Sequence, residues 1–283
     1  MFEQITIIGP GLLGASLAMK SQEAALSQRL VIGARRAQTR DTCMAQSWCD
    51  AAFCEPEAAV SESDLIVICT PIGSIVPLLK QIAPAIKPGA FVIDVGSTKR
   101  AICEAAEQIS KQRFTFIGAH PMAGSEKSGL AYARPDLYEA AACILTPTEQ
   151  TPEHALETIK SFWETIGTHV HVMDPESHDQ TVAAISHLPH LLASALSANL
   201  GQQDSTWNQL SGPGLRDTTR IAAGDPTLWQ QILLENKGPL LKALAGFENS
   251  LAEFKAALQS TDAKVIQDLL KKGKAFRDLL NHD

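Results

Sequence analysis

Three glycines near the start of the chain have a spacing that suits phosphate binding. Gly9, Gly11 and Gly14 follow the apolar run Ile5–Ile8 and open the helical pattern Leu12–Lys20. The first glycine permits a tight turn, the second lets the backbone approach a pyrophosphate, and the third lets helix and strand pack closely. The helix N-terminus adds free N–H groups and a partial positive charge. Because a strand precedes the loop and a helix follows it, the motif predicts a dinucleotide site rather than a ligand-free glycine turn.

The end of the second predicted strand, Leu30–Ile32, bears on the type of dinucleotide. NAD sites usually carry Asp or Glu there to bind the ribose 2′-hydroxyl, whereas this chain continues Gly33-Ala34-Arg35-Arg36. A guanidinium fork suits a 2′-phosphate, so we expect NADP as the cofactor, with NAD as the alternative. Both arginines could instead be solvated loop charges. The expected cofactor-binding residues are Gly9, Gly11, Leu12, Leu13, Gly14, Arg35, Arg36, Thr70 and Pro71.

Polar residues also gather in three other parts of the sequence. Asp94–Lys99 follows a predicted strand, and so does Gly118–Gly129. Open α/β sheets bind ligands at the carboxyl ends of their strands. The third group is split between Ser186–His190 and Leu215–Arg220 in the second half of the chain. These segments are therefore the candidates for the reacting part of a site.

Strand and helix patterns alternate through the first half of the chain. Continuously apolar runs such as Leu65–Cys69 are typical of parallel strands covered on both faces, and helical stretches such as Arg100–Lys111 fall between them. This alternation predicts a doubly wound parallel sheet of the Rossmann type, in the α/β class. From Pro175 onward only helical spacing appears. We therefore predict a dinucleotide-binding domain over residues 1–173 and an all-helical substrate and dimerisation domain over residues 174–283.

The composition restricts the class of protein. The net charge is −7 and no basic stripe offsets it, which argues against binding to nucleic acid or to an acidic membrane. We expect no apolar stretch to approach the roughly 18 residues of a membrane helix. The N-terminus lacks the pattern of a signal peptide, so a cytoplasmic location is expected. The 6 cysteines show no zinc-ligand spacing, so no metal site is expected.

Taken together, these motifs resemble those of the prephenate and arogenate dehydrogenases of tyrosine biosynthesis. The resemblance runs from about residue 5 to about residue 240. It rests on the glycine loop and on Asp94–Lys99, His120–Gly129, His187–His190 and Asp217–Arg220. The runs His-Pro-Met-Ala-Gly-Ser-Glu-Lys-Ser-Gly and Ser-His-Leu-Pro-His are specific in combination.

The resemblance implies an oxidative decarboxylation with prephenate, arogenate or both as substrate. Hydride passes from the ring carbinol to the nicotinamide, and loss of carbon dioxide gives 4-hydroxyphenylpyruvate or tyrosine. His120 matches the catalytic histidine of the family, whose neutral imidazole accepts the hydroxyl proton. Ser97 matches the serine that orients this histidine and the substrate.

The resemblance also implies a set of substrate-binding residues. Arg220 matches an arginine that binds a substrate carboxylate. Glu126 and Asp217 match acids that pair with this arginine and gate the pocket. His187 matches a histidine of the substrate pocket, and Ser125 is expected to contact the substrate carboxylate.

Several properties stay open at this point. His190 is interpreted as a helix-packing residue, with direct ligand contact as the alternative, and His178, near a helix start, is interpreted as structural. The sequence does not separate prephenate from arogenate. Tyrosine resembles the substrate and is a candidate competitive inhibitor. A homodimer is expected because the helices after residue 200 would expose apolar faces in a monomer.

Two other functions fit parts of the pattern. A 3-hydroxyacid dehydrogenase or an imine reductase also joins a Rossmann domain to a helical domain. Those enzymes typically have a lysine base in the region where this chain has His187 and His190. A non-catalytic NADP sensor would bind the nucleotide without turnover and would not need His120.

Overall fold

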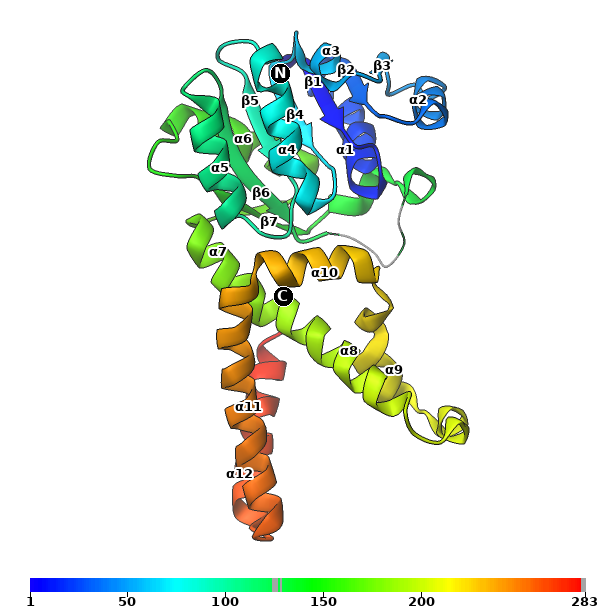
Figure 1. Cartoon of the computed structure of the whole chain (residues 1–283), viewed down its shortest axis with the longest axis vertical. Coiled ribbons are helices and arrows are strands. Elements are labelled where there is room, and N and C mark those ends of the chain that lie inside the picture. Colours follow the sequence, from blue (N-terminus) through cyan, green and yellow to red (C-terminus); the bar gives the residue numbers. More distant parts are fainter. Residues whose placement is uncertain (124–126, 128, 281–283) are drawn as a thin grey trace. The chain divides into compact units, whose positions relative to one another are not determined.

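The computed structural model describes residues 1–123, 127 and 129–280. Within these residues, eight strands form a single sheet (Figure 1). The strands are β1 Phe2–Ile8, β2 Ser27–Gly33, β3 Ala51–Phe53, β4 Leu65–Ile68, β5 Phe91–Asp94, β6 Thr115–Pro121, β7 Ala142–Thr146 and β8 His169–Val172. Their order in the sheet is β3-β2-β1-β4-β5-β6-β7-β8.

Helices connect most of these strands and follow the last one. The α-helices of the described chain are α1 Leu12–Glu23, α2 Ala37–Met44, α3 Pro56–Val60, α4 Ile72–Ile82, α5 Arg100–Ser110, α6 Glu153–Ile166, α7 Pro175–Val182, α8 Leu188–Leu200, α9 Pro213–Thr219, α10 Pro226–Glu235, α11 Lys237–Gln259 and α12 Ala263–Leu279. The short elements β3, α2 and α3 were not among the elements predicted from the sequence.

The central strands are buried on both faces. Leu65 and Val67 of β4 pack into one hydrophobic core with α1 and α6, whereas Ile66 and Ile68 pack into a second core with α4 and α5. Figure 1 shows α4 and α5 in front of the sheet and α6 behind it. Successive side chains of a strand point to opposite faces, so a strand with helices on both sides needs apolar residues at every position. This explains the uninterrupted apolar run in the sequence.

One pair of strands differs from the predicted parallel arrangement. Strands β6 and β7 are antiparallel, with His120 opposite Ile144, while β7 and β8 are parallel. The described part of the connection 122–141 contains only short 3₁₀ turns. Parallel neighbours need a crossover long enough to return the chain to the same edge, usually a helix. The sheet is therefore mostly parallel, and the predicted fold class, an α/β domain with a helical C-terminal part, is confirmed.

Helix α7, a π-helical segment and α8 form one continuous stretch, Pro175–Leu200. Among the described residues this is the one helix long and apolar enough to cross a membrane by length and composition, with a mean hydropathy of 1.2. The expectation that no stretch approaches this criterion is wrong. In the folded chain, 28% of its most apolar window is buried, and the polar side chains of His178 and Asp179 are buried with it.

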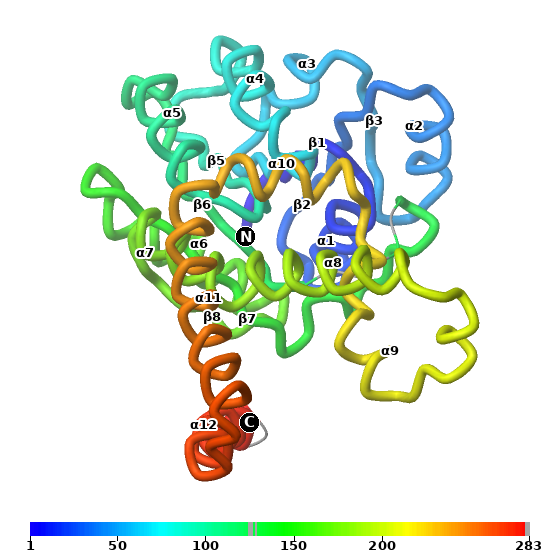
Figure 2. Tube along the Cα trace, turned by 60° about the horizontal axis from the view of Figure 1, so that its bottom comes forward, coloured from blue at the N-terminus to red at the C-terminus, as the bar shows by residue number. Residues whose placement is uncertain are grey.

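Helices α8 and α10 lie over the carboxyl edge of the sheet (Figure 2). Gly73, at the start of α4, donates its N–H to Gln231 of α10 at 3.3 Å. This contact joins the nucleotide-binding sheet to the helices that follow it.

Packing within the chain separates two units, Met1–Asn236 and Lys237–Asp283. The described part of the second unit consists of α11 and α12, which contact each other. Asp262 begins α12 as its N-cap and accepts the N–H groups of the following turn at 3.1 and 3.0 Å. The domain boundary between residues 173 and 174 stays a prediction from the sequence.

Candidate active site

The glycine loop between β1 and α1 has a conformation that requires glycine. Gly9 has a φ of +92°, and a Cβ at this position would lie 2.7 Å from the carbonyl oxygen of Cys69. A Cβ at Gly14 would collide with the carbonyl of Gly9, whereas Gly11 faces open space. No side chain caps α1. The amides of its first turn are therefore available to an anion, as expected for pyrophosphate binding.

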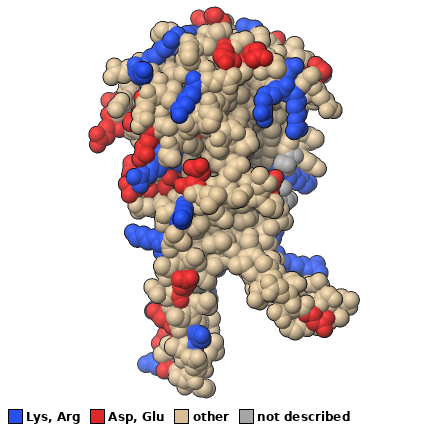
Figure 3. Space-filling model, viewed as in Figure 1, with Lys and Arg blue, Asp and Glu red and all other residues tan. Residues whose placement is uncertain are grey.

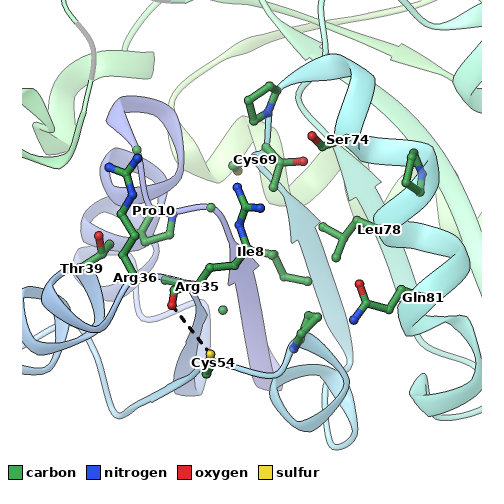
Figure 4. A pocket seen from close by; sticks show the side chains of 18 of the residues that line it. Ile8, Pro10, Arg35, Arg36, Thr39, Cys54, Cys69, Ser74, Leu78 and Gln81 are labelled. Carbon is green, nitrogen blue, oxygen red and sulfur yellow. Dashed lines mark hydrogen bonds between the residues drawn. The ribbon is translucent and has the colours of Figure 1, made fainter.

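A cavity of about 1020 Å³ lies at this loop (Figure 4). Its size suits a dinucleotide, because ligand pockets for small molecules commonly enclose several hundred Å³ or more. Of the predicted cofactor residues, Leu12, Leu13 and Gly14 are outside the cavity lining, and the two leucines pack half-buried against the core. The predicted residues that do line it are Gly9, Gly11, Arg35, Arg36, Thr70 and Pro71.

Arg35 and Arg36 leave the end of β2 in different directions. In Figure 4, the side chain of Arg35 extends into the cavity, and that of Arg36 runs along its wall. Arg40 fixes the backbone beneath them, since its Nη1 donates to the carbonyls of Ala34 and Arg35, both at 2.8 Å. Neither of the two guanidinium groups is engaged in a hydrogen bond or ion pair by the described residues. Both are thus available to a phosphate.

Asp94, the last residue of β5, organises the neighbouring part of the carboxyl edge. Its Oδ2 accepts the N–H of Gly96 at 2.8 Å and also binds the ammonium group of Lys99, and both charged side chains are fully buried. Its Oδ1 accepts the N–H of Ala119 at 3.3 Å. The carboxylate therefore ties the β5–α5 loop to β6 immediately before His120.

His120 is buried in β6 and takes part in a chain of hydrogen bonds. Its Nδ1 lies 2.8 Å from Nε2 of His178 in α7, and Nδ1 of His178 lies 2.8 Å from Oδ1 of Asp179. The carboxylate of Asp179 also accepts the N–H groups of Lys99 and Arg100 at 2.8 and 3.1 Å, at the start of α5. Three separate elements, β6, α7 and α5, thus meet through this chain.

The surroundings set the charge of each member. Burial, followed by electrostatic interaction with His178, Lys99 and His187, lowers the pKa of His120 well below its ordinary value of 6.5. Burial raises the pKa of Asp179, but the hydrogen bonds from His178 and from two backbone amides outweigh it and leave that pKa below its ordinary value. At neutral pH, His120 is therefore an uncharged imidazole and Asp179 a carboxylate.

His187 is the last residue of the π-helical segment Ala183–His187 and is buried against Asn236. The amide nitrogen of Asn236 donates to the carbonyl oxygen of Asp179 at 2.7 Å and lies 3.0 Å from Nδ1 of His187. Because this nitrogen is a donor, Nδ1 of His187 accepts and the ring proton sits on Nε2. Burial lowers the pKa of His187 to about 4, and Nε2 has no partner among the described residues. Nε2 of His187 is therefore a neutral N–H donor.

His190 lies one helical turn further along. Its ring stacks on the indole of Trp229, with centroids 3.5 Å apart and an interplanar angle of 9°. A Cβ at Gly224 would lie 2.5 Å from the indole nitrogen, so the stack depends on glycine at that position. Nδ1 of His190 has no partner among the described residues. The packing interpretation and the ligand alternative thus both have a structural basis.

The remaining predicted site residues are placed less tightly. Ser97 is half-buried in the β5–α5 loop, and the described hydrogen bond of His120 goes to His178 instead. Arg220 and Asp217 are exposed, and neither forms an ion pair with a described residue. Ser125 and Glu126 lie outside the described residues. The structure therefore gathers His120 and His187 at the sheet edge but does not bring Arg220 and Asp217 to them.

Three residues of this arrangement were missed by the sequence reasoning. His178, Asp179 and Asn236 are all buried, and each bonds a residue that is distant in the sequence. One signal was available, because His178 stands four residues before Val182 and so occupies the stripe of α7 that an amphipathic helix buries. A polar residue at an apolar position often marks a site.

Comparison with known proteins agrees with this architecture. The family model described as "Prephenate dehydrogenase, nucleotide-binding domain" matches residues 24–172, and "Prephenate dehydrogenase, dimerization domain" matches residues 174–272. The cyclohexadienyl dehydrogenase of Zymomonas mobilis is 30% identical, over 100% of this chain and 98% of its own length.

Two solved structures are similar over nearly their whole length. The prephenate dehydrogenase from A. aeolicus, in complex with hydroxyphenyl propionate and NAD⁺, has a TM-score of 0.92 and 30% identity and covers 99% of both chains. The Synechocystis arogenate dehydrogenase has a TM-score of 0.86 and 31% identity, over 98% of this chain and 99% of its own. Since the two family models together span most of the sequence, this chain belongs to the prephenate dehydrogenase family.

Proposed function

We propose that this protein catalyses the oxidative decarboxylation of prephenate, arogenate or both, with a nicotinamide dinucleotide as hydride acceptor. The observation that carries the proposal is His120, a buried and neutral imidazole at the carboxyl edge of a sheet whose glycine loop fits a dinucleotide. Membership of the prephenate dehydrogenase family supports it. The products would be 4-hydroxyphenylpyruvate from prephenate and tyrosine from arogenate.

The protein has to position the substrate and remove one proton. When bound, the nicotinamide supplies the acceptor for the hydride that leaves the carbinol carbon. His120 accepts the hydroxyl proton, since a neutral imidazole within hydrogen-bond reach is an effective general base. Nε2–H of His187, which lacks a partner among the described residues, can donate to a substrate oxygen. Loss of carbon dioxide makes the ring aromatic and needs little further assistance.

We assign the substrate contacts as the family resemblance suggests. Arg220 would bind a carboxylate, and its exposed guanidinium is not occupied by an ion pair with a described residue. Asp217 would pair with it, and Ser97 would orient His120 and the substrate. Ser125 and Glu126 belong to the same proposal and lie outside the described residues.

We propose NADP as the preferred cofactor. The support is the pair Arg35 and Arg36, which line the cavity at the end of β2, where an NAD site would usually have a carboxylate. Two guanidinium groups without a described partner suit a 2′-phosphate, which has two negative charges and several acceptor oxygens.

A homodimer is the proposed assembly. The matched family model describes a dimerization domain. Within the unit formed by α11 and α12, the large apolar side chains of Leu241, Leu251, Leu258, Leu270 and Phe276 are exposed in the single chain. Exposed apolar side chains in this number are typical of a subunit interface. Figure 3 shows acidic and basic side chains interspersed on the visible surface, so electrostatics alone would not select a strongly charged partner.

Initial rates with four combinations of substrate and cofactor test the proposal. Prephenate and arogenate are each assayed with NAD⁺ and with NADP⁺, with identification of the aromatic product by chromatography. Turnover with at least one substrate and a higher kcat/KM with NADP⁺ are expected. A protein that binds the nucleotide but turns over neither substrate would overturn the catalytic proposal, and a higher kcat/KM with NAD⁺ would overturn the cofactor assignment.

A further inference from the structure

The hydrogen-bond chain from Asp179 through His178 to His120 determines which atom donates and which accepts in each bond. Asp179 is ionised and can only accept, so Nδ1 of His178 must carry the proton that bridges the 2.8 Å between them. Nε2 of a neutral His178 then has a lone pair. It accepts the proton on Nδ1 of His120 across the second 2.8 Å contact. The lone pair of His120 is therefore left on Nε2.

This direction matters because a histidine base works only through its unprotonated nitrogen. In a free neutral imidazole, either nitrogen can carry the proton. A partner on the far nitrogen selects one tautomer and fixes the orientation of the ring. A buried Asp that holds a catalytic histidine in this way is the principle of the hydrolase triads. Here His178 stands between the carboxylate and the base.

The same hydrogen-bond chain lowers the free-energy cost of protonating the buried ring of His120. Burial strongly disfavours the imidazolium, and the neighbours that face the ring are mostly cationic or neutral: Lys99, His178 and His187. Asp94 is already paired with Lys99. Asp179 is the carboxylate that is linked to the ring of His120 through the intervening ring of His178. The exposed guanidinium group of Arg100 also interacts electrostatically with the carboxylate of Asp179.

We propose that His178 and Asp179 are positioning residues that fix the Nδ1–H tautomer of His120 and stabilise its imidazolium during turnover. The inference rests on the proposed function, in which the substrate hydroxyl loses a proton. In that step the O–H bond breaks and the proton goes to Nε2 of His120. The electron pair of the carbinol C–H bond leaves with the hydride for the bound nicotinamide, and the remaining O–H electron pair forms the carbonyl. His120 becomes an imidazolium facing Asp179 through His178, and it later returns its proton to solvent.

Two substitutions at His178 separate positioning from packing. His178→Gln keeps an acceptor for His120 and a donor for Asp179, whereas His178→Leu fills similar space without either. His171→Leu, at an exposed histidine of β8, is the matched control. For each full-length variant, the measurements are kcat and its pH dependence, cofactor affinity, and ¹⁵N NMR of histidine-labelled protein, which reports the tautomer of His120 directly.

The expected result is a His178→Leu enzyme with kcat lowered by about 10- to 1000-fold, which is at most the loss expected for removing a general base or its orienting group. Cofactor affinity stays unchanged, and the tautomer of His120 becomes mixed. His178→Gln recovers most of the rate and keeps the Nδ1–H tautomer. An Nε2–H tautomer in the unmodified protein, or equal rates in the two His178 variants, would overturn the inference.

The NMR measurement keeps the inference separate from the proposed function. If the unmodified protein shows no turnover but His120 has the Nδ1–H tautomer, the proposed reaction fails while the tautomer assignment stands. If turnover is found and the tautomer is Nε2–H, the positioning assignment fails alone. Should His178→Leu not fold, the spectrum of the unmodified protein and the comparison with His178→Gln still decide.

Discussion

Lys99 and Asp94 form an ion pair with both side chains fully buried at the carboxyl edge of the sheet. Two charges removed from water stabilise a fold only when each is compensated, and here the backbone amides of Gly96 and Ala119 complete the shell of Asp94. The pair also places Lys99 so that its own N–H meets Asp179. The buried charges thus connect fold stability to the geometry around His120.

Removing one partner of this pair should be strongly destabilising. Lys99→Met leaves the Asp94 carboxylate buried without its counter-ion, so the free energy of unfolding should fall by about 3–5 kcal/mol. Lys87→Met is the matched control, because Lys87 pairs with Asp64 at 2.6 Å but is 32% exposed. Its loss should be about 0–1 kcal/mol. Urea denaturation measures both values, and similar losses would contradict the assigned importance of burial.

Replacement of the proposed base should affect chemistry and not cofactor binding. His120→Asn should lower kcat by about 10²–10⁴-fold, the usual contribution of a general base. The dissociation constant of the cofactor, measured by fluorescence titration, should stay nearly constant because His120 is outside the cavity lining. His171→Asn, at an exposed histidine, should leave both quantities unchanged. Near-normal turnover of His120→Asn would remove His120 from this assignment.

The pH dependence of the rate should reflect the buried position of His120. The base must be neutral to accept a proton, and burial places its pKa well below 6.5. The neutral form therefore predominates from pH 8 down through pH 6.5, and activity should decline only at more acidic pH. A profile of kcat/KM against pH at constant ionic strength measures this. A decline centred near or above pH 6.5 would show that His120 is not the neutral buried base described.

The two arginines at the end of β2 should discriminate between the cofactors. The double substitution Arg35→Ala with Arg36→Ala should raise the KM for NADP⁺ by at least about 10- to 100-fold, because the loss of even one charge-assisted hydrogen bond costs about 1.5–3 kcal/mol. The KM for NAD⁺, which lacks the 2′-phosphate, should change little. Arg29→Ala, at the opposite end of the same strand, is the control and should alter neither value. Equal effects on both cofactors would indicate that the arginines do not contact a 2′-phosphate.

The sequence predicted the features that depend on local pattern. Apolar runs covered on both faces, such as Leu65–Ile68, identify parallel strands, and the glycine spacing identifies the turn at Gly9. Two features depend on long-range packing and escaped this reasoning. One is the antiparallel pairing of β7 with β6, and the other is the partnership of His178 with His120, which arises only when α7 packs against the sheet. The periodicity of α7 indicates that His178 is buried, but it does not specify His120 as the partner.

The roles that the family resemblance implies and the positions that the structure gives agree for some residues and differ for others. The motif that includes Arg220 implies a carboxylate contact, but the single chain leaves this side chain exposed. His120, in contrast, stands at a strand end whose position the sheet determines. Residues on the sheet could therefore be located from the sequence more securely than residues on the later helices.

The π-helical segment Ala183–His187 makes the site sensitive to chain length. A π turn holds one residue more than an α turn, and each residue of a helix corresponds to about 100° of rotation. Removal of one residue can be absorbed by a return to regular α geometry, which keeps the flanking turns in phase. Insertion of a further residue before His187 would instead turn His187 and α8 by about 100° relative to His178 and Asp179. His187 would then lose its alignment with Asn236, although every side chain of the site would still be present. Conservative substitutions along this segment should thus be tolerated far better than a single-residue insertion.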